Sequence, residues 1–233
     1  MASPRLFSFY CAAFLAAGSF AAQAQSKAIS AQQLPLTAAK LADFVPKGWR
    51  IEQRLGADIN ADQQPDSVLA LIQTAQYTGK NGVPTRDRAL VVALAQPEGM
   101  WRRAGFTAQL LYCTSCFLSS GSAPALTLSE QGVLEVAHGD FDGDVGSSST
   151  VQFKFEPQTG RLRLINEEVT RHYSRSKEKS ISTDLLTGNE TTTTEESKDE
   201  DEEPRVKTQT RTLKLPKYYL EDYKEGRTLL HKF

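Results

Sequence analysis

The chain has 233 residues and a nearly balanced charge, with 27 Lys and Arg against 28 Asp and Glu, for a formal net charge of −1. This balance argues against nucleic acid as a partner, because phosphate backbones are bound by an excess of basic side chains. The length suits one sizeable hydrophobic core, or a core with an appended hairpin.

Residues 1–24 have the pattern of a secretory signal peptide. Arg5 precedes an apolar run from Leu6 to Phe20, and Ala22-Gln23-Ala24 supplies the small residues that signal peptidase requires. We therefore predict cleavage after Ala24 and a periplasmic or extracellular location. No later apolar run approaches the ~20 residues that a membrane-spanning helix needs, so we expect no stable membrane span in the mature chain.

The start of the mature chain predicts little regular structure. Residues 25–35 are polar and Ala-rich without periodicity, which indicates a flexible lead-in. A short helix is expected over residues 38–44, because Thr37 can cap it and the apolar residues follow helical spacing. Residues 49–55 then alternate between apolar and polar side chains, as in a half-buried strand.

Strand patterns bounded by turn residues continue along the rest of the chain. The clearest hairpin joins Val151–Phe155 to Arg161–Ile165 through Pro157-Gln158-Thr159-Gly160. The other predicted strands are residues 67–77, 88–96, 100–112, 126–128 and 132–137, followed by Thr-rich, charged ribbons at 167–175, 180–186 and 205–215.

These patterns predict one mainly β domain over residues 36–233. We expect antiparallel meander sheets arranged as a sandwich or an incomplete propeller, with one short N-terminal helix. Residues 190–204 contain a block of acidic side chains that repel one another and have no apolar residue to bury. We therefore predict a mobile acidic loop there.

The segment from Asp58 to Asp66 carries side-chain oxygens at alternate positions and is followed by the apolar run Val68–Ile72. A short loop can surround a calcium ion when every second residue points inward with an oxygen ligand. The apolar run predicts a buried strand that would anchor the loop. The predicted metal ligands are Asp58, Asn60, Asp62, the backbone carbonyl of Gln64, and Asp66.

This loop and its strand resemble the calcium loops of FG-GAP and VCBS repeat proteins, whose pattern is approximately Asp-x-Asn-x-Asp-Gly-x-x-Asp. A weaker likeness to secreted VCBS-repeat-like bacterial proteins extends from Trp49 to Tyr223. The resemblance implies a structural Ca²⁺ ion and no catalytic role for it. The chain departs from the pattern at two positions. Gln63 stands where the family has Gly in a left-handed conformation, and Ala57 stands where the family usually has Gly as well.

A second acidic cluster repeats part of the pattern at Asp140, Asp142 and Asp144. Ser148 stands where a fourth carboxylate would be expected. The cluster is therefore either a half-formed second metal site or a polar turn. Two such loops suggest a degenerate duplication, whereas a closed propeller needs at least about four blades.

Cys113 and Cys116 are predicted to form a disulfide, because an exported chain enters an oxidising compartment. We predict no catalytic residue and favour a non-enzymatic interaction module of the envelope or extracellular space, with an unknown protein or glycan as partner. Two alternatives stay open. One is a periplasmic thiol-disulfide protein that uses the Cys113/Cys116 pair, and the other is a hydrolase that uses carboxylates such as Glu135, Asp140 and Asp142.

Overall fold

The structure is a computed structural model that describes residues 28–79, 82–116, 124–198, 203–223 and 230. The predicted signal peptide lies outside the described residues. The fold is mainly β, with 56% strand and 7% helix, and its antiparallel sheets do not close into a barrel. The predicted fold class is therefore confirmed, and the sheets are arranged in a sandwich-like manner.

The first sheet, sheet A, has five strands in the order β1-β7-β6-β3-β2. Its strands are β1 (Thr37–Ala38), β2 (Trp49–Ala57), β3 (Asp66–Gln73), β6 (Arg88–Ala95) and β7 (Trp101–Thr107). All eight residues of β3 are buried, because this central strand is covered on both faces. The predicted buried strand after the acidic loop is thus confirmed.

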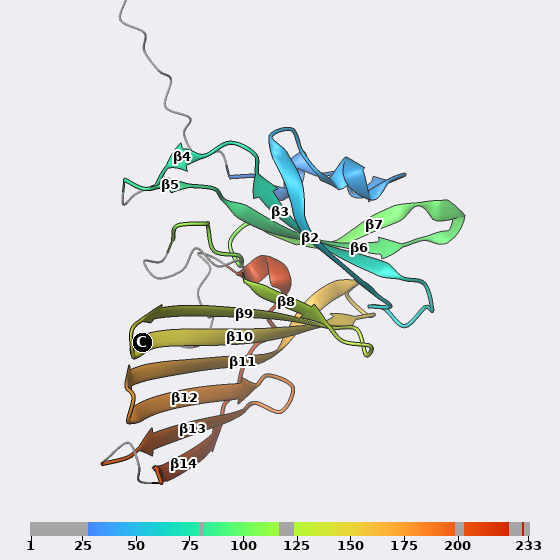
Figure 1. Cartoon of the computed structure of the whole chain (residues 1–233). Helices are drawn as coiled ribbons and strands as arrows, with labels where there is room; N and C mark the ends of the chain where they lie inside the picture. Colours follow the sequence, from blue (N-terminus) through green and yellow to red (C-terminus); the bar gives the residue numbers. More distant parts are fainter. Residues whose placement is uncertain (1–27, 80–81, 117–123, 199–202, 224–229, 231–233) are drawn as a thin grey trace, which may run out of the picture.

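The second sheet, sheet C, has seven strands in the order β14-β13-β12-β11-β10-β9-β8. It is a meander in which each strand pairs with the next one along the chain (Figure 1). Its strands are β8 (Ala125–Leu128), β9 (Val133–Asp142), β10 (Val145–Glu156), β11 (Arg161–Ser174), β12 (Lys177–Asp184), β13 (Asn189–Glu196) and β14 (Arg205–Thr212). The predicted hairpin is confirmed, since β10 and β11 pair from Glu156 opposite Arg161.

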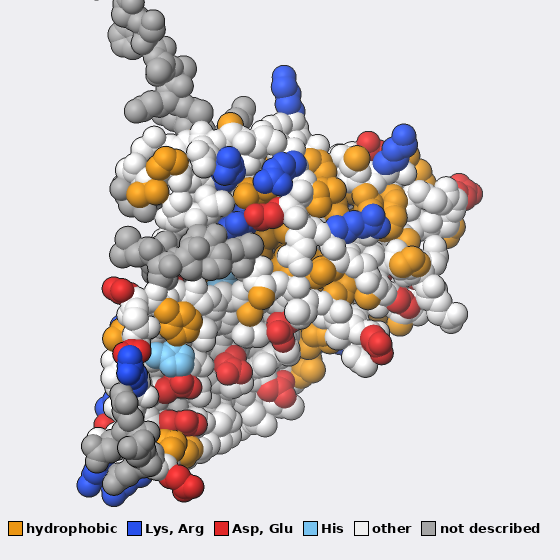
Figure 2. Space-filling view, in the orientation of Figure 1, with side chains coloured by type: hydrophobic (Ala, Val, Ile, Leu, Met, Phe, Trp, Pro, Cys, Tyr) orange, Lys and Arg blue, Asp and Glu red, His pale blue; other side chains and the backbone are white. Residues whose placement is uncertain are grey.

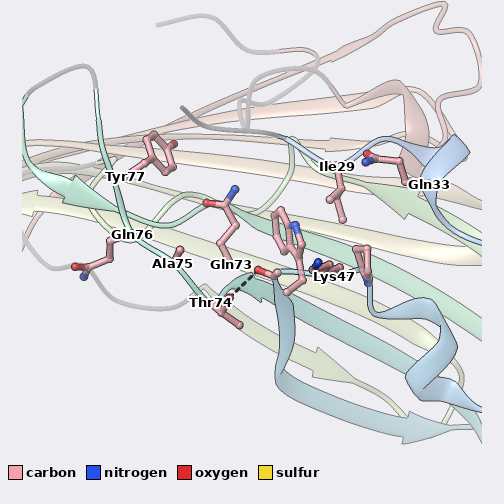
Figure 3. A pocket seen from close by; sticks show the side chains of 11 residues that line it. Ile29, Gln33, Lys47, Gln73, Thr74, Ala75, Gln76 and Tyr77 are labelled. Carbon is pink, nitrogen blue, oxygen red and sulfur yellow. Dashed lines mark hydrogen bonds between the residues drawn. The ribbon is translucent and has the colours of Figure 1, made fainter. Parts of the chain in front are cut away.

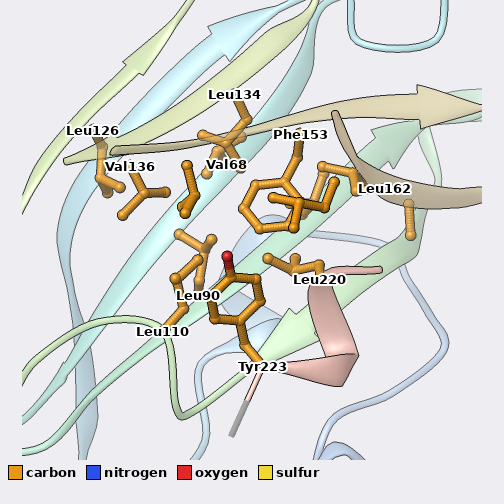
Figure 4. Close-up of a cluster of buried hydrophobic side chains, with 14 of the residues drawn as sticks. Val68, Leu90, Leu110, Leu126, Leu134, Val136, Phe153, Leu162, Leu220 and Tyr223 are labelled. Carbon is orange, nitrogen blue, oxygen red and sulfur yellow. The ribbon is translucent and has the colours of Figure 1, made fainter. Parts of the chain in front are cut away.

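The main core fills the space between the two sheets. Sheet A contributes Val68 and Leu90, and sheet C contributes Leu134, Phe153 and Leu162, all fully buried (Figure 4). These residues alternate with polar ones along β9, β10 and β11, as expected for strands with one face in the core. The C-terminal segment adds Leu220 and Tyr223 to the same core (Figure 4).

A second core lies on the opposite face of sheet A, beneath the N-terminal segment. Here Ile29, Leu34 and Phe44 pack against Leu69 and Val91 of β3 and β6. The guanidinium of Arg103 also donates to the backbone carbonyls of Ala31 and Leu34. Residues 28–35, which we predicted to belong to a flexible lead-in, thus place two buried apolar side chains against sheet A.

The helical content consists of short 3₁₀ turns rather than the predicted N-terminal helix over residues 38–44. The described turns are η1 (Ala31–Gln33), η2 (Leu41–Phe44), η3 (Pro97–Gly99) and η4 (Leu220–Asp222). Ala38 instead lies in β1, which pairs with β7. A small separate hairpin is formed by β4 (Tyr77–Thr78) and β5 (Pro84–Thr85).

Sheet C extends well beyond sheet A, so that β12 to β14 project from the sandwich (Figure 1). Every residue of β14 is exposed. Residues 190–196, which we predicted to belong to a mobile acidic loop, lie in β13 and pair with β14, while residues 199–202 lie outside the described residues. Thr-rich, charged sequence forms these strands because Thr favours a pleated surface and cross-strand neighbours pair on both faces.

Candidate metal-binding loop at the join of the two sheets

The candidate metal-binding loop connects β2 to β3, the edge strand and the neighbouring strand of sheet A. Residues 58–65 leave the sheet, and Asp66 begins β3. All five predicted ligand residues therefore belong to one compact turn whose end is fixed by a buried strand.

Asp66 is the most buried of the predicted ligands, since the residue is 1% exposed and both of its carboxylate oxygens accept hydrogen bonds. Oδ2 accepts the backbone N–H of Ile59 at 2.9 Å, and Oδ1 accepts the backbone N–H of Ala95 at 2.7 Å. Burial raises the pKa of Asp66, these two bonds lower it, and the charges of Asp62 and Asp58 raise it further, with a net increase. The carboxylate is thus held in place and lies within the field of two like charges.

The other side-chain oxygens of the loop converge on its own backbone. Asp58 Oδ1 and Asn60 Oδ1 both accept the N–H of Asp62, at 3.1 and 3.0 Å. Asp58 Oδ2 accepts the N–H of Gln63 at 2.7 Å, and Asp62 Oδ1 accepts the N–H of Gln64 at 2.8 Å. The chain therefore curls around the Asp58 carboxylate in a series of side-chain-stabilised turns.

Gln63 adopts the left-handed conformation that the family pattern assigns to Gly, with φ of 66°. Ala61 is left-handed too, with φ of 63°. Each non-Gly residue in this region costs about 1 kcal/mol or more. Gln63 and Ala61 therefore make the loop backbone more costly than Gly would at the same positions.

The loop lies at the join between the two sheets. Ile59 is buried in the core between them. A Cβ atom on Gly132, in the turn between β8 and β9, would stand only 2.8 Å from the carbonyl oxygen of Asp58 and 2.9 Å from that of Ile59. Sheet C therefore packs directly against the backbone of the loop, and Gly132 is required at this close approach.

The donor set suits a hard cation, since it consists of carboxylate, amide and carbonyl oxygens. In the described part of the chain, however, no three His, Cys, Asp or Glu side chains are grouped closely enough to hold a metal ion. Both oxygens of Asp58 and one oxygen of Asp62 accept backbone N–H groups, and the other oxygen of Asp62 accepts the side-chain amide of Asn60. Calcium coordination by this loop would therefore require these two side chains to turn from the backbone toward the ion.

The second acidic cluster lies in a β-hairpin. Asp140 and Asp142 are part of β9, Gly143 and Asp144 form the turn, and Val145 of β10 pairs with Asp142. Asp144 forms an ion pair with Arg175, with Oδ2 at 2.7 Å from Nε. The segment is built as a tight turn, unlike the longer loop at residues 58–66.

Cys113 and Cys116 form the predicted disulfide. The two residues between the cysteines form hydrogen bonds with residues 84–86 of the same chain. Thr114 exchanges hydrogen bonds with the backbone of Arg86, both at 3.0 Å, and the Ser115 hydroxyl donates to the carbonyl of Pro84 at 2.7 Å. These bonds hold the disulfide ring against residues 84–86, and the segment that follows, residues 117–123, lies outside the described residues.

The carboxylates considered for a hydrolase do not converge. Glu135 lies on the face of β9 opposite to that of Asp140 and Asp142, because side chains alternate along a strand. Glu135 Oε2 accepts a hydrogen bond from Gln152 at 2.8 Å on the outer face of sheet C. A surface pocket elsewhere is lined by residues such as Trp49, Gln73 and Tyr77 and by no Asp or Glu (Figure 3).

Sequence reasoning missed a buried ion pair between β2 and β6. Arg88 donates from Nε and Nη2 to the two oxygens of Glu52, at 2.6 and 2.9 Å, and from Nη1 to the carbonyl of Tyr112. Glu52 reaches this position because it is the extra residue of a β-bulge between Ile51 and Gln53. The signal for this ion pair in the sequence was Arg88, a charged residue at the start of the strongly apolar strand β6.

His138 was also more buried than its place beside a turn suggested. Its ring lies 4.1 Å from the ring of Tyr112, measured between centroids, and its Nε2 is buried without a hydrogen bond. Burial lowers the pKa of His138 to about 4, a backbone hydrogen bond involving Leu110 raises it, and the nearby charge of Arg88 lowers it. The imidazole is therefore neutral at pH 7.

No family model, curated protein or solved structure matches the chain. Among the described residues, none of the helices has the length and apolar character needed to cross a membrane. The disulfide fits a location outside the cytoplasm, because such bonds persist in oxidising compartments.

Proposed function

We propose that this protein is an exported, calcium-stabilised β domain that serves as a non-enzymatic interaction module of the cell envelope or extracellular space. The observation that carries the proposal is the position of the Asp58–Asp66 loop at the join of the two sheets. An ion bound there would stabilise the contact between sheet A and sheet C.

Three features of the loop support the calcium part of the proposal. The loop presents only oxygen donors at alternate positions, Gln63 has the left-handed conformation of a metal-loop turn, and Asp66 is preorganised by two backbone bonds. The charges of Asp58 and Asp62 raise the pKa of Asp66. Calcium would supply positive charge to three carboxylates that otherwise repel one another.

The effect of calcium on stability should be modest. Extracellular calcium modules often have Kd values of about 10⁻⁴ to 10⁻³ M. At ~1 mM calcium, mass action then adds about 0.4 to 1.4 kcal/mol to the free energy of unfolding. For a domain of this size, that corresponds to a rise in melting temperature of about 1 to 5 °C.

The interaction part of the proposal is supported by the projecting strands of sheet C. Strands β12 to β14 contribute few residues to the core, and β14 is exposed along its whole length. A sheet extended beyond its core offers surface to a partner. Glu135 lies on the face of β9 opposite to that of Asp140 and Asp142, so these three carboxylates do not form one group.

The experiment is thermal unfolding of the exported chain with calcium, magnesium or chelator. We expect calcium to raise the melting temperature and magnesium to have a smaller effect, because magnesium dehydrates reluctantly. Asp58→Ala combined with Asp62→Ala should abolish the shift. The matched control is Asp140→Ala with Asp142→Ala, which removes the same charge from the second acidic cluster and should keep the shift. A wild-type chain that melts identically in calcium and in chelator contradicts the proposal.

A further inference from the structure

The two faces of the projecting half of sheet C differ in charge. Side chains alternate between the faces along each strand, so the register assigns the paired residues from 168 to 212 in β11 to β14 to one face or the other. The face continuous with Val169 and the core, here called the inner face, carries six basic residues and two acidic ones: Arg171, Lys177, Lys179, Arg205, Lys207 and Arg211, with Glu190 and Glu196.

The opposite, outer face carries acidic side chains and hydroxyls. Its charged residues in these strands are Glu168, Glu178, Asp184 and Glu195, with His172 beside Glu178 at 3.0 Å. Figure 2 shows sheet C with several Asp and Glu side chains on the visible face and Lys and Arg gathered at its lower edge. The separation of charge between two faces of a single sheet layer makes the inner face a distinct electropositive surface.

Three of the inner-face cations form a row across the sheet. Arg171 lies directly opposite Lys179, Lys179 lies opposite Thr194, and Thr194 lies opposite Lys207. We call Arg171, Lys179 and Lys207 the basic row. Adjacent strands are about 4.8 Å apart, so the row places three positive charges within roughly 15 Å. Like charges directly opposite each other destabilise a sheet.

The carboxylates on the same face do not neutralise this row. Glu190 is 2.6 Å from Arg211, and Glu196 is 3.3 Å from Lys177, so each already has a cation of its own. Within the described part of the chain, no ion pair is formed by Arg171, Lys179 or Lys207. Asp140 of β9 lies two strands from Arg171, because Ser147 of β10 pairs with both residues.

The surroundings of the basic row favour a hydrophilic, extended partner. Apart from Val169 and Ile181, the neighbouring inner-face side chains are polar, including Thr192, Thr194 and Gln209. Such a surface has few apolar side chains to insert into a lipid bilayer. Tyr173 is 42% exposed, and its ring lies 5.4 Å from the guanidinium carbon of Arg171, where it can stack on a sugar ring.

We infer that the basic row binds an anionic polysaccharide, with the acidic groups of the glycan on Arg171, Lys179 and Lys207 and its hydroxyls on the interspersed Thr and Gln side chains. This inference rests on the proposed role as an interaction module and names the class of partner. The row suits a linear glycan, because successive acidic groups can follow it from β11 to β14.

The experiment measures binding of the exported chain to dextran sulfate, with neutral dextran of the same length as the matched probe. We expect binding to dextran sulfate that weakens as salt is raised, and none to neutral dextran. The variant Arg171→Gln, Lys179→Gln, Lys207→Gln should bind dextran sulfate at least about tenfold more weakly than the wild type does. The control Lys47→Gln, Lys154→Gln, Lys214→Gln removes the same charge from exposed sites elsewhere and should bind as the wild type does.

Three results would overturn the inference. They are no binding of the wild type at low salt, equal loss in the two triple variants, and equally tight binding to poly-glutamate or to anionic lipid vesicles, which would assign the row to an acidic protein or a membrane. The calcium-induced rise in melting temperature is measured on the same samples. If the wild type shows the calcium-induced rise but does not bind the glycan, the inferred partner is wrong and the proposed metal site stands.

Discussion

Asp66 and Ala95 are joined across sheet A, because the carboxylate at the start of β3 accepts the backbone N–H at the end of β6 at 2.7 Å. The second oxygen of the same carboxylate accepts the N–H of Ile59, whose side chain lies in the core between the sheets. One buried acid thus connects the candidate metal loop, sheet A and the inter-sheet core. This connection is the reason to expect that changes in the loop alter the stability of the whole domain.

The first prediction concerns this carboxylate. Asp66→Asn keeps the size of the side chain but turns one acceptor into a donor, which would face a backbone N–H. We expect the free energy of unfolding to fall by about 1 to 3 kcal/mol, the usual cost of an unsatisfied buried group. Urea unfolding measures it. Asp142→Asn, at an exposed position, serves as the control and should change stability by less than about 0.5 kcal/mol. Equal effects of the two substitutions would contradict the assignment.

The second prediction concerns the left-handed backbone at Gln63. Gly adopts this conformation without the steric cost that other residues pay. Gln63→Gly should therefore raise the free energy of unfolding by about 0.5 to 1 kcal/mol, and Gln63→Val should lower it, both measured by urea unfolding in chelator. A destabilising Gly substitution would mean that the turn is not left-handed in solution.

The third prediction concerns the ion pair between Arg88 and Glu52. The Arg88 side chain is 3% exposed, so removal of its partner leaves a buried charge. Glu52→Gln should cost about 3 kcal/mol or more. A double-mutant cycle with Arg88→Met should show strong coupling, because the double variant removes the stranded charge. Additive effects of the two substitutions would show that the pair is not formed.

The fourth prediction is a pH dependence of stability. The pKa of His138 is about 4 in the folded protein, below its ordinary value near 6.5. Between these two values the unfolded chain binds more protons, so stability is lost as pH falls from about 6.5 toward 4. We expect a loss of about 2 kcal/mol between pH 7 and pH 5 from this group.

The control for this pH dependence is His138→Gln, which cannot take up the proton. Urea unfolding of the variant at pH 7 and pH 5 should show a smaller difference than that of the wild type. An unchanged difference would mean that His138 is not the group responsible.

The parts of the fold that the sequence predicted are those with local signals. The β10–β11 hairpin has strict alternation on both sides of a Pro-Gln-Thr-Gly turn, and the disulfide joins two closely spaced cysteines. The strand after the acidic loop was equally clear from its apolar run. In each case the determining interactions lie within about twenty residues of one another, so they are visible as a pattern.

The parts that were missed depend on contacts between distant segments. Ile29 and Leu34 stand singly in a polar stretch, and only the face of sheet A explains their burial. Residues 190–196 look like part of an acidic loop until β12 and β14 are placed on either side. The bulge that directs Glu52 toward Arg88 cannot be predicted from a local sequence pattern, because it depends on how β2 pairs with β3.

The most direct test of the central claim is a calorimetric titration of residues 25–233 with calcium after removal of bound metal by chelator. The account predicts one saturable site with a Kd of about 10⁻⁴ to 10⁻³ M, present in the wild type and lost when Asp58 and Asp62 are both changed to Ala. Absence of any saturable heat in the wild type, or an unchanged titration in that double variant, would contradict it.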